Sequence, residues 1–492
     1  MGSPSTTTVA PISAKHTIIP TEIQLNILAW LTKSHWNPNE SKPRLSNYAR
    51  VCKGWQSIVE QESFRHLTLH ASDIECFERH VRPHRRGYVK HILLEICIED
   101  CYDRRPLNPG YTDRKNSTTF TLAVWRLWQV LVTWKDHRLT VELGILSSFE
   151  RRLASLHNEE NYWPKPWSLA QDQGGNLSMI PHIDHLATFN LPPTDGMFII
   201  GWNWQRSGLL GRAPVEFNSN TLLGRDLPKV EVIARLLIRR RYFCNVSPNT
   251  LAQIFGSAPY TEVIHVERWC YGMGRRDSEW DEHSENLVHA LSPSLKRFSF
   301  FEEYSTPYHQ RSGRMVLPRS NTRLLNSLTE TGRHLEHISI SFAIDAQDFF
   351  LPQQQLDFSL LITLALTSET MTSRSAVMVN ELLGNAARAV KKMPKLKLLE
   401  IWNYKTGETG IFVYEKLDRC SEITWQGTWD FQISQEVKDT WWEVLADSDG
   451  DIFELSVRHV TLELDQLTSL ASIFPYLKLR EHILDEVSWT QV

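Results

Sequence analysis

The chain of 492 residues lacks a hydrophobic run long enough to cross a membrane. A membrane-spanning helix needs roughly 18 or more apolar residues, and the longest runs here, Met197–Gly201 and Leu360–Leu366, have the length of core elements. The stretch Met1–Lys15 is polar and has no apolar centre, so it does not resemble a secretory signal. We expect a disordered tail over residues 1–16 and no membrane partner.

Cysteines are few and scattered. The seven residues form no Cys-x-x-Cys pair, and an odd, dispersed set is typical of free thiols in a reducing compartment. Only Cys97 and Cys101 lie close together, and the two further ligands that a zinc site needs are missing nearby. We therefore place the protein in the cytoplasm, the nucleus or both.

An excess of positive charge is missing as well. Lys and Arg number 53 against 57 Asp and Glu, which gives a net charge of −4. General nucleic-acid binders usually have a strong basic excess. We expect no nucleic-acid partner.

The common catalytic motifs are also missing. There is no Gly-x-Ser-x-Gly, no His-Glu-x-x-His and no phosphate-binding loop, and Gly272-Met273-Gly274 lacks the third glycine of a dinucleotide site. The most metal-like string is His182-Ile183-Asp184-His185, which lacks further ligands and fits a polar loop better. We expect no catalytic residue, no metal and no cofactor.

Short amphipathic segments occupy the first seventy residues. Ile19-Pro20-Thr21-Glu22 predicts a helix start, because proline suits the first turn and an acidic residue is favourable at the positive end of the helix dipole. One apolar stripe then follows, formed by Ile23, Ile27, Leu28 and Leu31. After the polar loop Thr32–Arg44, a crowded apolar pattern from Leu45 to Val59 predicts two more short helices. Such a small segment makes a poor core of its own, so it either caps the next domain or meets a partner.

This pattern resembles the F-box. Members of that family show Leu-Pro-x-Glu-Ile, an apolar helix and then Val-Cys-Lys-x-Trp; here Ile19-Pro20-Thr21-Glu22-Ile23 and Val51-Cys52-Lys53-Gly54-Trp55 stand in those places. The resemblance implies a three-helix module over residues 17–70 that docks on the Skp-family adaptor of a cullin-based ubiquitin ligase. It assigns this adaptor contact to Ile19, Pro20, Ile23, Ile27, Leu28, Leu31, Leu45, Val51, Cys52 and Trp55. For Val51 and Trp55, a position inside the module's own core is an equal alternative.

A short strand pattern recurs through the rest of the chain. Apolar residues at positions 1, 4 and 6 begin at Phe64, Val89, Leu227, Leu295, Leu335, Leu396 and Ile452. This is the strand template of leucine-rich repeats, and helical patterns precede several copies, such as Val379–Met393, which Pro394 ends. We predict an α/β fold: a small all-α F-box followed by an irregular leucine-rich-repeat-like solenoid over residues 71–492, with strands on one face and helices on the other. An ordinary α/β domain without repeats is the alternative.

Two segments depart from this pattern. Phe120–Trp134 predicts a deeply packed helix, because it is apolar on most of its circumference. Residues 150–219 show no periodicity and predict a long insertion, which in compact proteins is often functional. Tryptophan is favoured at binding hot spots, so the insertion's Trp163, Trp167, Trp202 and Trp204 are our candidates for target contacts. The alternative is that they fix a long loop to the body.

Charge clusters give weaker signals. The basic groups at Arg82–Arg86 and Arg239-Arg240-Arg241 suit either a phosphate or acidic peptide, or a solvated face with salt bridges to nearby acids. The acidic run Asp277–Glu285 predicts an exposed loop.

The resemblance extends to the C-terminal region. Many fungal F-box proteins carry a leucine-rich-repeat-like region, and Leu227-Pro228-Lys229-Val230, Leu295–Phe298 and Met393–Asn403 look like landmarks of that group. The whole chain then resembles a non-enzymatic substrate-recognition subunit that binds the Skp adaptor, and through it a cullin, by its N-terminal module and a protein target by its body. One alternative is a non-catalytic repeat scaffold whose N-terminal helices only cap the solenoid. Another is an enzyme with its site in Glu150–Ser219.

Overall fold

The computed structural model describes residues 20, 22–24, 26–27, 30, 45–99, 109–147, 213–222, 225–240, 244–271, 274–303, 320–405 without 353 and 355, 407–417, 420–446, 454–485 without 468, and 488. The insertion predicted over 150–219 therefore lies almost wholly outside the described residues, and so do Trp163, Trp167, Trp202, Trp204, Arg241 and the His182–His185 string.

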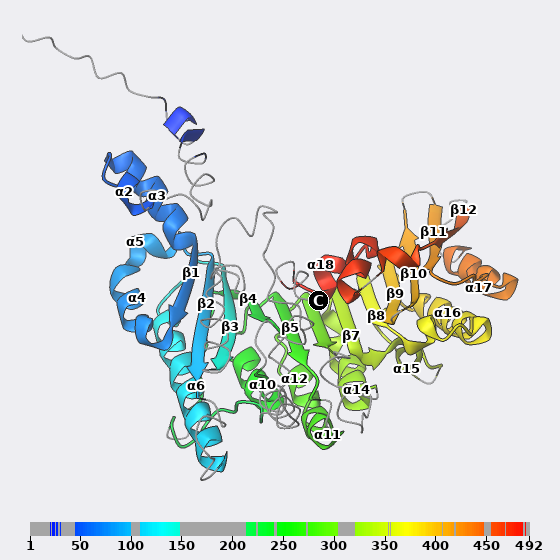
Figure 1. The fold of residues 1–492 in the computed structure, drawn as a ribbon, viewed down its shortest axis with the longest axis horizontal. Helices are drawn as coiled ribbons and strands as arrows, with labels where there is room; N and C mark the ends of the chain where they lie inside the picture. Colours follow the sequence, from blue (N-terminus) through cyan, green and yellow to red (C-terminus); the bar gives the residue numbers. More distant parts are fainter. Residues whose placement is uncertain are drawn as a thin grey trace, which may run out of the picture.

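One open, twelve-stranded sheet is the frame of the described chain (Figure 1). Its strands lie side by side in the order of the sequence. All neighbours are parallel except β9–β10 and β10–β11, which are antiparallel. The strands are β1 (His66–His70), β2 (His91–Ile98), β3 (Leu139–Ser147), β4 (Ile233–Ile238), β5 (Val263–Trp269), β6 (Arg297–Glu303), β7 (His337–Asp345), β8 (Thr363–Thr367), β9 (Leu398–Lys405), β10 (Glu408–Lys416), β11 (Cys420–Gly427) and β12 (Glu454–Thr461).

Thirteen α-helices are described, and most of them cover one face of the sheet (Figure 1). On that face lie α4 (Ile74–His80), α6 (Pro109–Leu131), α10 (Pro248–Gly256), α11 (Gly274–Glu282), α12 (Glu285–His289), α14 (Thr322–Thr331), α15 (Ala346–Phe349), α16 (Ala376–Val390) and α17 (Gln435–Ala446). The others are α2 (Leu45–Tyr48), α3 (Lys53–Arg65) and α5 (Pro83–Arg86) near the N-terminus and α18 (Arg480–Ile483) near the C-terminus. The predicted α/β class is confirmed.

Local sequence explains where several helices begin. Ser247 caps α10 by accepting a hydrogen bond from the Thr250 amide, with Pro248 in the first turn. Asn321 and Ser375 cap α14 and α16 in the same way. These side chains satisfy amides that have no partner inside the helix, which stabilises a helix by about 1 kcal/mol each.

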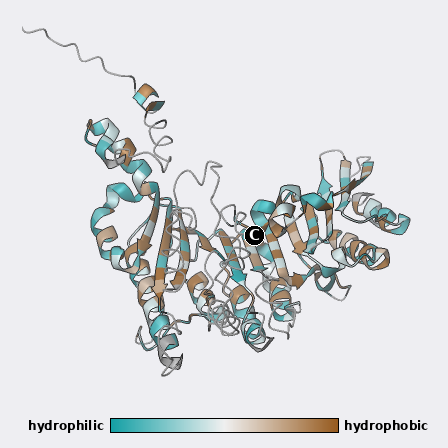
Figure 2. Ribbon diagram, in the orientation of Figure 1, coloured by the Kyte–Doolittle hydropathy of each residue, from teal (hydrophilic) through white to brown (hydrophobic). Residues whose placement is uncertain are grey.

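Side chains alternate along the strands, and most strands bury both faces, whereas β12 is largely exposed. One alternate set, including Ile92, Val141, Phe298 and Ile338, packs against the helices and forms the main core. In the other set, Phe301, Ala365, Trp402, Ile411 and Val413 form a second core from β6 to β10, and Leu93 of β2 and Leu237 of β4 are buried outside it. Hydrophobic residues run along the strands of both regions (Figure 2).

The C-terminal segment closes the second core. It comprises Leu462–Ser488 without residues 468, 486 and 487, and we call it the strap. It contains the 3-10 helices η6 (Leu464–Gln466) and η7 (Leu470–Tyr476) as well as α18, and it crosses the face of the sheet opposite to the helices (Figure 1). Its apolar side chains, such as Phe474, Leu479 and Ile483, are buried against the strands. Small strand residues, Ser299, Ser339 and Ala365, let the strap approach closely.

The strand template located six of its seven predicted strands. In each of those six, template positions 4 and 6 lie in the strand, as Leu67 and Leu69 do in β1. The copy at Leu227 is wrong, because the strand forms on the next copy of the same template, Ile233-x-x-Leu236-x-Ile238. Strands β3, β5, β8, β10 and β11 were not predicted.

Two predicted helices are confirmed and one predicted loop is wrong. The apolar helix of residues 120–134 is α6, with Phe120, Leu127 and Trp128 fully buried, and the helix over 379–393 is α16. The acidic run 277–285, predicted as an exposed loop, forms most of α11 and the start of α12 instead. Its Asp277 is buried because it pairs with Arg268. In the described part of the chain, no helix has both the length and the apolar character to span a bilayer.

Candidate functional site

The N-terminal helices are attached to the sheet through the C-terminal half of α3. Val59 is buried there, and the Glu60 carboxylate accepts two hydrogen bonds from Arg85 of α5, at 2.8 and 3.0 Å. The same guanidinium lies 5.2 Å from the centre of the Phe64 ring. Hydrogen bonds from Arg85 and Gln56 lower the pKa of Glu60, so this pair is charged at neutral pH.

The other half of this segment carries exposed hydrophobic side chains. Ile23 is 48% exposed, Trp30 66% and Val51 62%. We call these three residues the N-terminal apolar surface. Trp55 is partly buried, its ring lies 6.5 Å from the Tyr48 ring, and its amide donates to the Cys52 sulphur that caps α3. Exposed hydrophobic groups that gather on one short segment mark an interaction site.

The residues predicted for the adaptor contact fall into three groups. Pro20, Ile23, Val51 and Cys52 are exposed, while Ile27 and Trp55 are partly buried. Leu45 begins α2, but its side chain lies outside the description. Ile19, Leu28 and Leu31 are not among the described residues.

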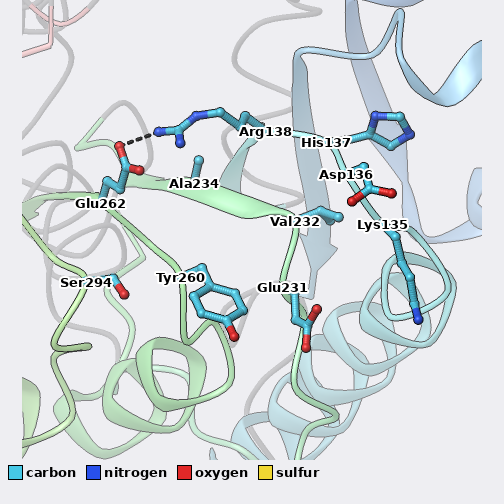
Figure 3. Close-up of a pocket in the computed structure, with 10 residues that line it drawn as sticks. All are labelled: Lys135, Asp136, His137, Arg138, Glu231, Val232, Ala234, Tyr260, Glu262 and Ser294. Atoms are coloured by element: carbon cyan, nitrogen blue, oxygen red, sulfur yellow. Dashed lines mark hydrogen bonds and ion pairs between the residues drawn. The ribbon is translucent and has the colours of Figure 1, made fainter.

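A polar hollow of about 470 Å³ lies at the N-terminal ends of β3, β4 and β5 (Figure 3). The loop Lys135–Arg138 lines one side, and Glu231, Tyr260 and Glu262 line the other. Arg138 forms an ion pair with Glu262 across it, and this hydrogen bond lowers the pKa of the carboxyl. The ion pair therefore holds the Glu262 carboxyl in its ionised form.

A row of charged side chains, all buried except the partly exposed Arg235, crosses the sheet at β3, β4 and β5 on the strap side. We call it the central charged site; it consists of Glu142, Arg235, Arg239, Arg240 and Glu267. Arg239 is fully buried and holds Glu142 through two hydrogen bonds, one of them 2.8 Å from Nε to Oε1. Such bidentate pairs are the strong ones among ionic contacts.

Two histidines extend this row. His91 Nε2 lies 3.1 Å from Glu142, and His265 Nε2 lies 2.9 Å from Glu267. Burial acts to raise the pKa of Glu142, but Arg239 and His91 outweigh it, and the pKa is lowered. Glu142 is therefore charged at neutral pH despite its complete burial.

Two residues of the strap complete the central charged site. The Asp485 carboxylate lies 3.1 Å from both Arg239 Nη1 and Arg235 Nη2, and its amide donates to Glu267 at 3.0 Å. The Ser488 hydroxyl donates to the other oxygen of Glu267 at 2.6 Å. Of the two predictions for this basic run, salt bridges to acids of the same chain are observed for Arg239, although inside the protein and not on a solvated face. Sequence reasoning did not identify Asp485, Ser488 or Glu142.

A second buried charged cluster lies on the helix side of the sheet. Arg268 Nη2 bridges Asp277 and Glu302, and its guanidinium lies 3.9 Å from the centre of the Trp280 ring. Burial, with Glu302 nearby, raises the pKa of Asp281 to about 7. We interpret the cluster as structural, because Asn321 of the α14 cap donates to Asp281 and so links α11 to α14. Among the described residues, no group of three or more His, Cys, Asp or Glu is arranged to hold a metal ion.

A third buried charge, Glu400 of β9, holds the strap by its backbone. Its two oxygens accept hydrogen bonds from the amides of Lys478 and Leu479, at 2.8 and 3.0 Å. Burial outweighs these two donors and raises the pKa of Glu400 from 4.5 to about 7. Polar contacts thus hold the strap at two places: at Lys478 and Leu479 by Glu400 of β9, and at its last described residues by the central charged site over β3 to β5.

The raised pKa of Glu400 predicts a pH-dependent stability. Because the folded state binds this proton more tightly than the unfolded state does, the stabilisation is complete below pH 4.5 and is lost as the pH rises through 7. Relative to Glu400→Gln, which does not titrate, the wild type should lose about 3 kcal/mol of unfolding free energy across this interval. Urea unfolding of both proteins from pH 4.5 to 8 measures it. The exposed Glu381→Gln serves as the control, and a difference between wild type and Glu400→Gln that does not change with pH would contradict the prediction.

A comparison with protein families finds a match to the C-terminal part of the chain. Residues 290–485 match a family of unknown function (DUF6546). This part of the chain begins just before β6 and runs to Asp485 of the strap. No curated protein matches the chain.

Proposed function

We propose that this protein is the substrate-recognition subunit of an SCF-type (Skp–cullin–F-box) ubiquitin ligase, working in the cytoplasm or nucleus. The N-terminal module binds a Skp-family adaptor, and through it a cullin. The body binds a protein target. The chain itself does no chemistry: it holds the target near a ubiquitin-loaded enzyme, which raises the effective concentration of the two reactants.

The observation that carries this proposal is the N-terminal apolar surface. Ile23 and Val51 are exposed at the positions where the F-box resemblance puts adaptor contacts. An amphipathic helix that presents such anchors to a partner helix is a common recognition mode. The module also lies at the β1 end of the sheet, away from the strap, so an adaptor can approach it freely (Figure 1).

The body suits the second half of the proposal. Strands in sequence order, with helices on one face, support an irregular leucine-rich-repeat-like solenoid. Proteins of this architecture present extended surfaces to their partners.

One observation favours the alternative of a scaffold whose N-terminal helices are only a cap. Val59 and the Glu60–Arg85 pair attach α3 firmly to the body. A pure cap needs these contacts but does not need exposed Ile23 and Val51. Adaptor binding therefore separates the two functions.

Replacing Ile23 with aspartate should abolish most adaptor binding. A charge placed in an apolar hot spot costs 2 kcal/mol or more, which corresponds to at least about 30-fold weaker binding. Because Ile23 is half exposed, the free energy of unfolding should change by no more than about 0.5 kcal/mol. The measurement is co-purification with a Skp-type adaptor, followed by calorimetric titration.

The matched control is Val377→Asp, since Val377 is 79% exposed on α16, far along the chain from the module. It should bind the adaptor as the wild type does. Equal binding by Ile23→Asp would show that the docking surface is assigned wrongly. If the wild type binds no adaptor, the ligase function is rejected, and the scaffold whose N-terminal helices are only a cap remains.

A further inference from the structure

The last described residues of the strap are bound differently from the rest of it. From Leu462 to Leu484 the strap is held mainly by apolar packing in the second core. Asp485 and Ser488, which we call the hook, are held by polar contacts with the central charged site. The hook can therefore leave its site while the apolar part of the strap stays in place.

The contacts of the hook have the form of peptide recognition. Two guanidinium groups bind its carboxylate, and Glu267 accepts both a backbone amide and a side-chain hydroxyl. A third guanidinium, that of Arg240, donates to the Ser488 carbonyl at 3.4 Å. The site thus binds a carboxylate, the backbone amide of the same residue and a hydroxyl three residues further along the chain.

Asp485 supplies a negative charge to the site. Its carboxylate lies between Arg239, which is fully buried, and Arg235, whose side chain is 38% exposed. Removing the carboxylate partner of a buried cation is costly. The position that Asp485 leaves beside Arg239 therefore favours another carboxylate.

We propose that the central charged site is a binding site for a short acidic peptide in a turn, which the hook occupies in the free protein: the Ser488 amide donates to the Asp485 carbonyl at 2.7 Å. The peptide carries a carboxylate and, three residues later, a hydroxyl, as Asp485 and Ser488 do. If the proposed function holds, this peptide is a segment of the ligase target. That identification is the only part of the inference that rests on the proposed function. Binding itself involves no adaptor.

The hook and the peptide compete for one site. The apparent dissociation constant of the peptide equals its intrinsic value divided by the fraction of molecules with the hook released. In the wild type that fraction is small, because the hook makes charge-assisted hydrogen bonds to buried partners. Weakening the hook should therefore tighten the binding of a peptide that keeps the wild-type groups.

The test uses the full chain without any adaptor. The probe is a fluorescein-labelled peptide with the sequence of residues 485–492, DEVSWTQV. Fluorescence anisotropy should show that the chain carrying Asp485→Asn and Ser488→Ala binds it about tenfold or more tightly than the wild type does. The same peptide with both substitutions is the matched control and should bind neither chain.

Hydrogen exchange completes the experiment by reporting on the hook itself. In the double variant, the amide of Asp485 should lose protection while those of Lys478 and Leu479 keep theirs. Should the double variant fail to fold, Ser488→Ala alone removes only the contact to Glu267 and tests the same competition. The proposal is overturned if the hook is released and the probe binds no better than the control peptide, or if the hook amide stays protected. Neither result bears on adaptor binding, which the Ile23→Asp experiment decides separately.

Discussion

Replacing Arg239 with alanine should lower the free energy of unfolding by about 3–5 kcal/mol. Its side chain is fully buried and pairs with both Glu142 and Asp485. Removing it leaves the buried carboxylates of Glu142 and Asp485 without their main cation. The net contribution of the intact ion pairs to stability is much smaller, because desolvation of the charges offsets their attraction. The loss therefore reflects the two orphaned anions. Urea unfolding at neutral pH measures the change.

Two controls separate this explanation from a general effect of losing an arginine. Arg126 of α6 is exposed, so Arg126→Ala should change stability by no more than about 0.5 kcal/mol. Adding Glu142→Gln to Arg239→Ala should restore part of the loss, because it removes one orphaned charge. If the double variant is no more stable than Arg239→Ala, the buried charge is not the cause.

Replacing Trp128 with alanine should have an effect of similar size, about 3–5 kcal/mol. The indole is fully buried between α6 and the sheet, so its removal creates a large cavity. Its Nε1 also donates to the Ser257 hydroxyl at 2.7 Å, which joins α6 to the residue that follows α10. Differential scanning calorimetry and urea unfolding give the change.

Trp442 provides the matched control, because it is 48% exposed on α17. Trp442→Ala should remain within about 0.5 kcal/mol of the wild type. Trp128→Phe should fall between the two, since it keeps most of the volume and loses only the hydrogen bond to Ser257. A Trp128→Ala protein as stable as Trp442→Ala would show that α6 is not part of the main core.

The strands that could be predicted share large apolar residues on the helix face. Phe298 and Phe300 of β6, for example, stand at template positions. Strand β8 carries the same template at Leu361, Leu364 and Leu366, so its sequence was sufficient although it was not recognised. Strand β5 was not predictable in this way. Thr261 stands at its template position 1, where an apolar residue is required, although Ile264 and Val266 occupy positions 4 and 6. Its buried Glu267 accepts from the amide of Asp485, which lies 218 positions away in the sequence.

Partners that lie far apart in the sequence also explain why residues of the central charged site were not predicted. The exposed residues of the N-terminal segment follow from local amphipathic periodicity, so a candidate surface there could be proposed from the sequence. The central charged site has no such local signal. Arg239 was noticed as part of a basic run, but Glu142 lies 97 positions before it and Asp485 lies 246 positions after it. Only the folded sheet and the strap bring them together.

The distance between Glu267 and the hook has a consequence for synthesis. The two are 218 positions apart, and the acceptor precedes its donor in the chain. Ribosomes add about 5–20 residues per second, so β5 leaves the ribosome roughly 10 to 40 s before Asp485 is made. During that time, Arg239 and Glu267 belong to a nascent sheet in which Asp485 and Ser488 are not yet present. The helix-covered face can assemble strand by strand as it is translated, whereas the opposite face reaches its final form only after the strap has been made.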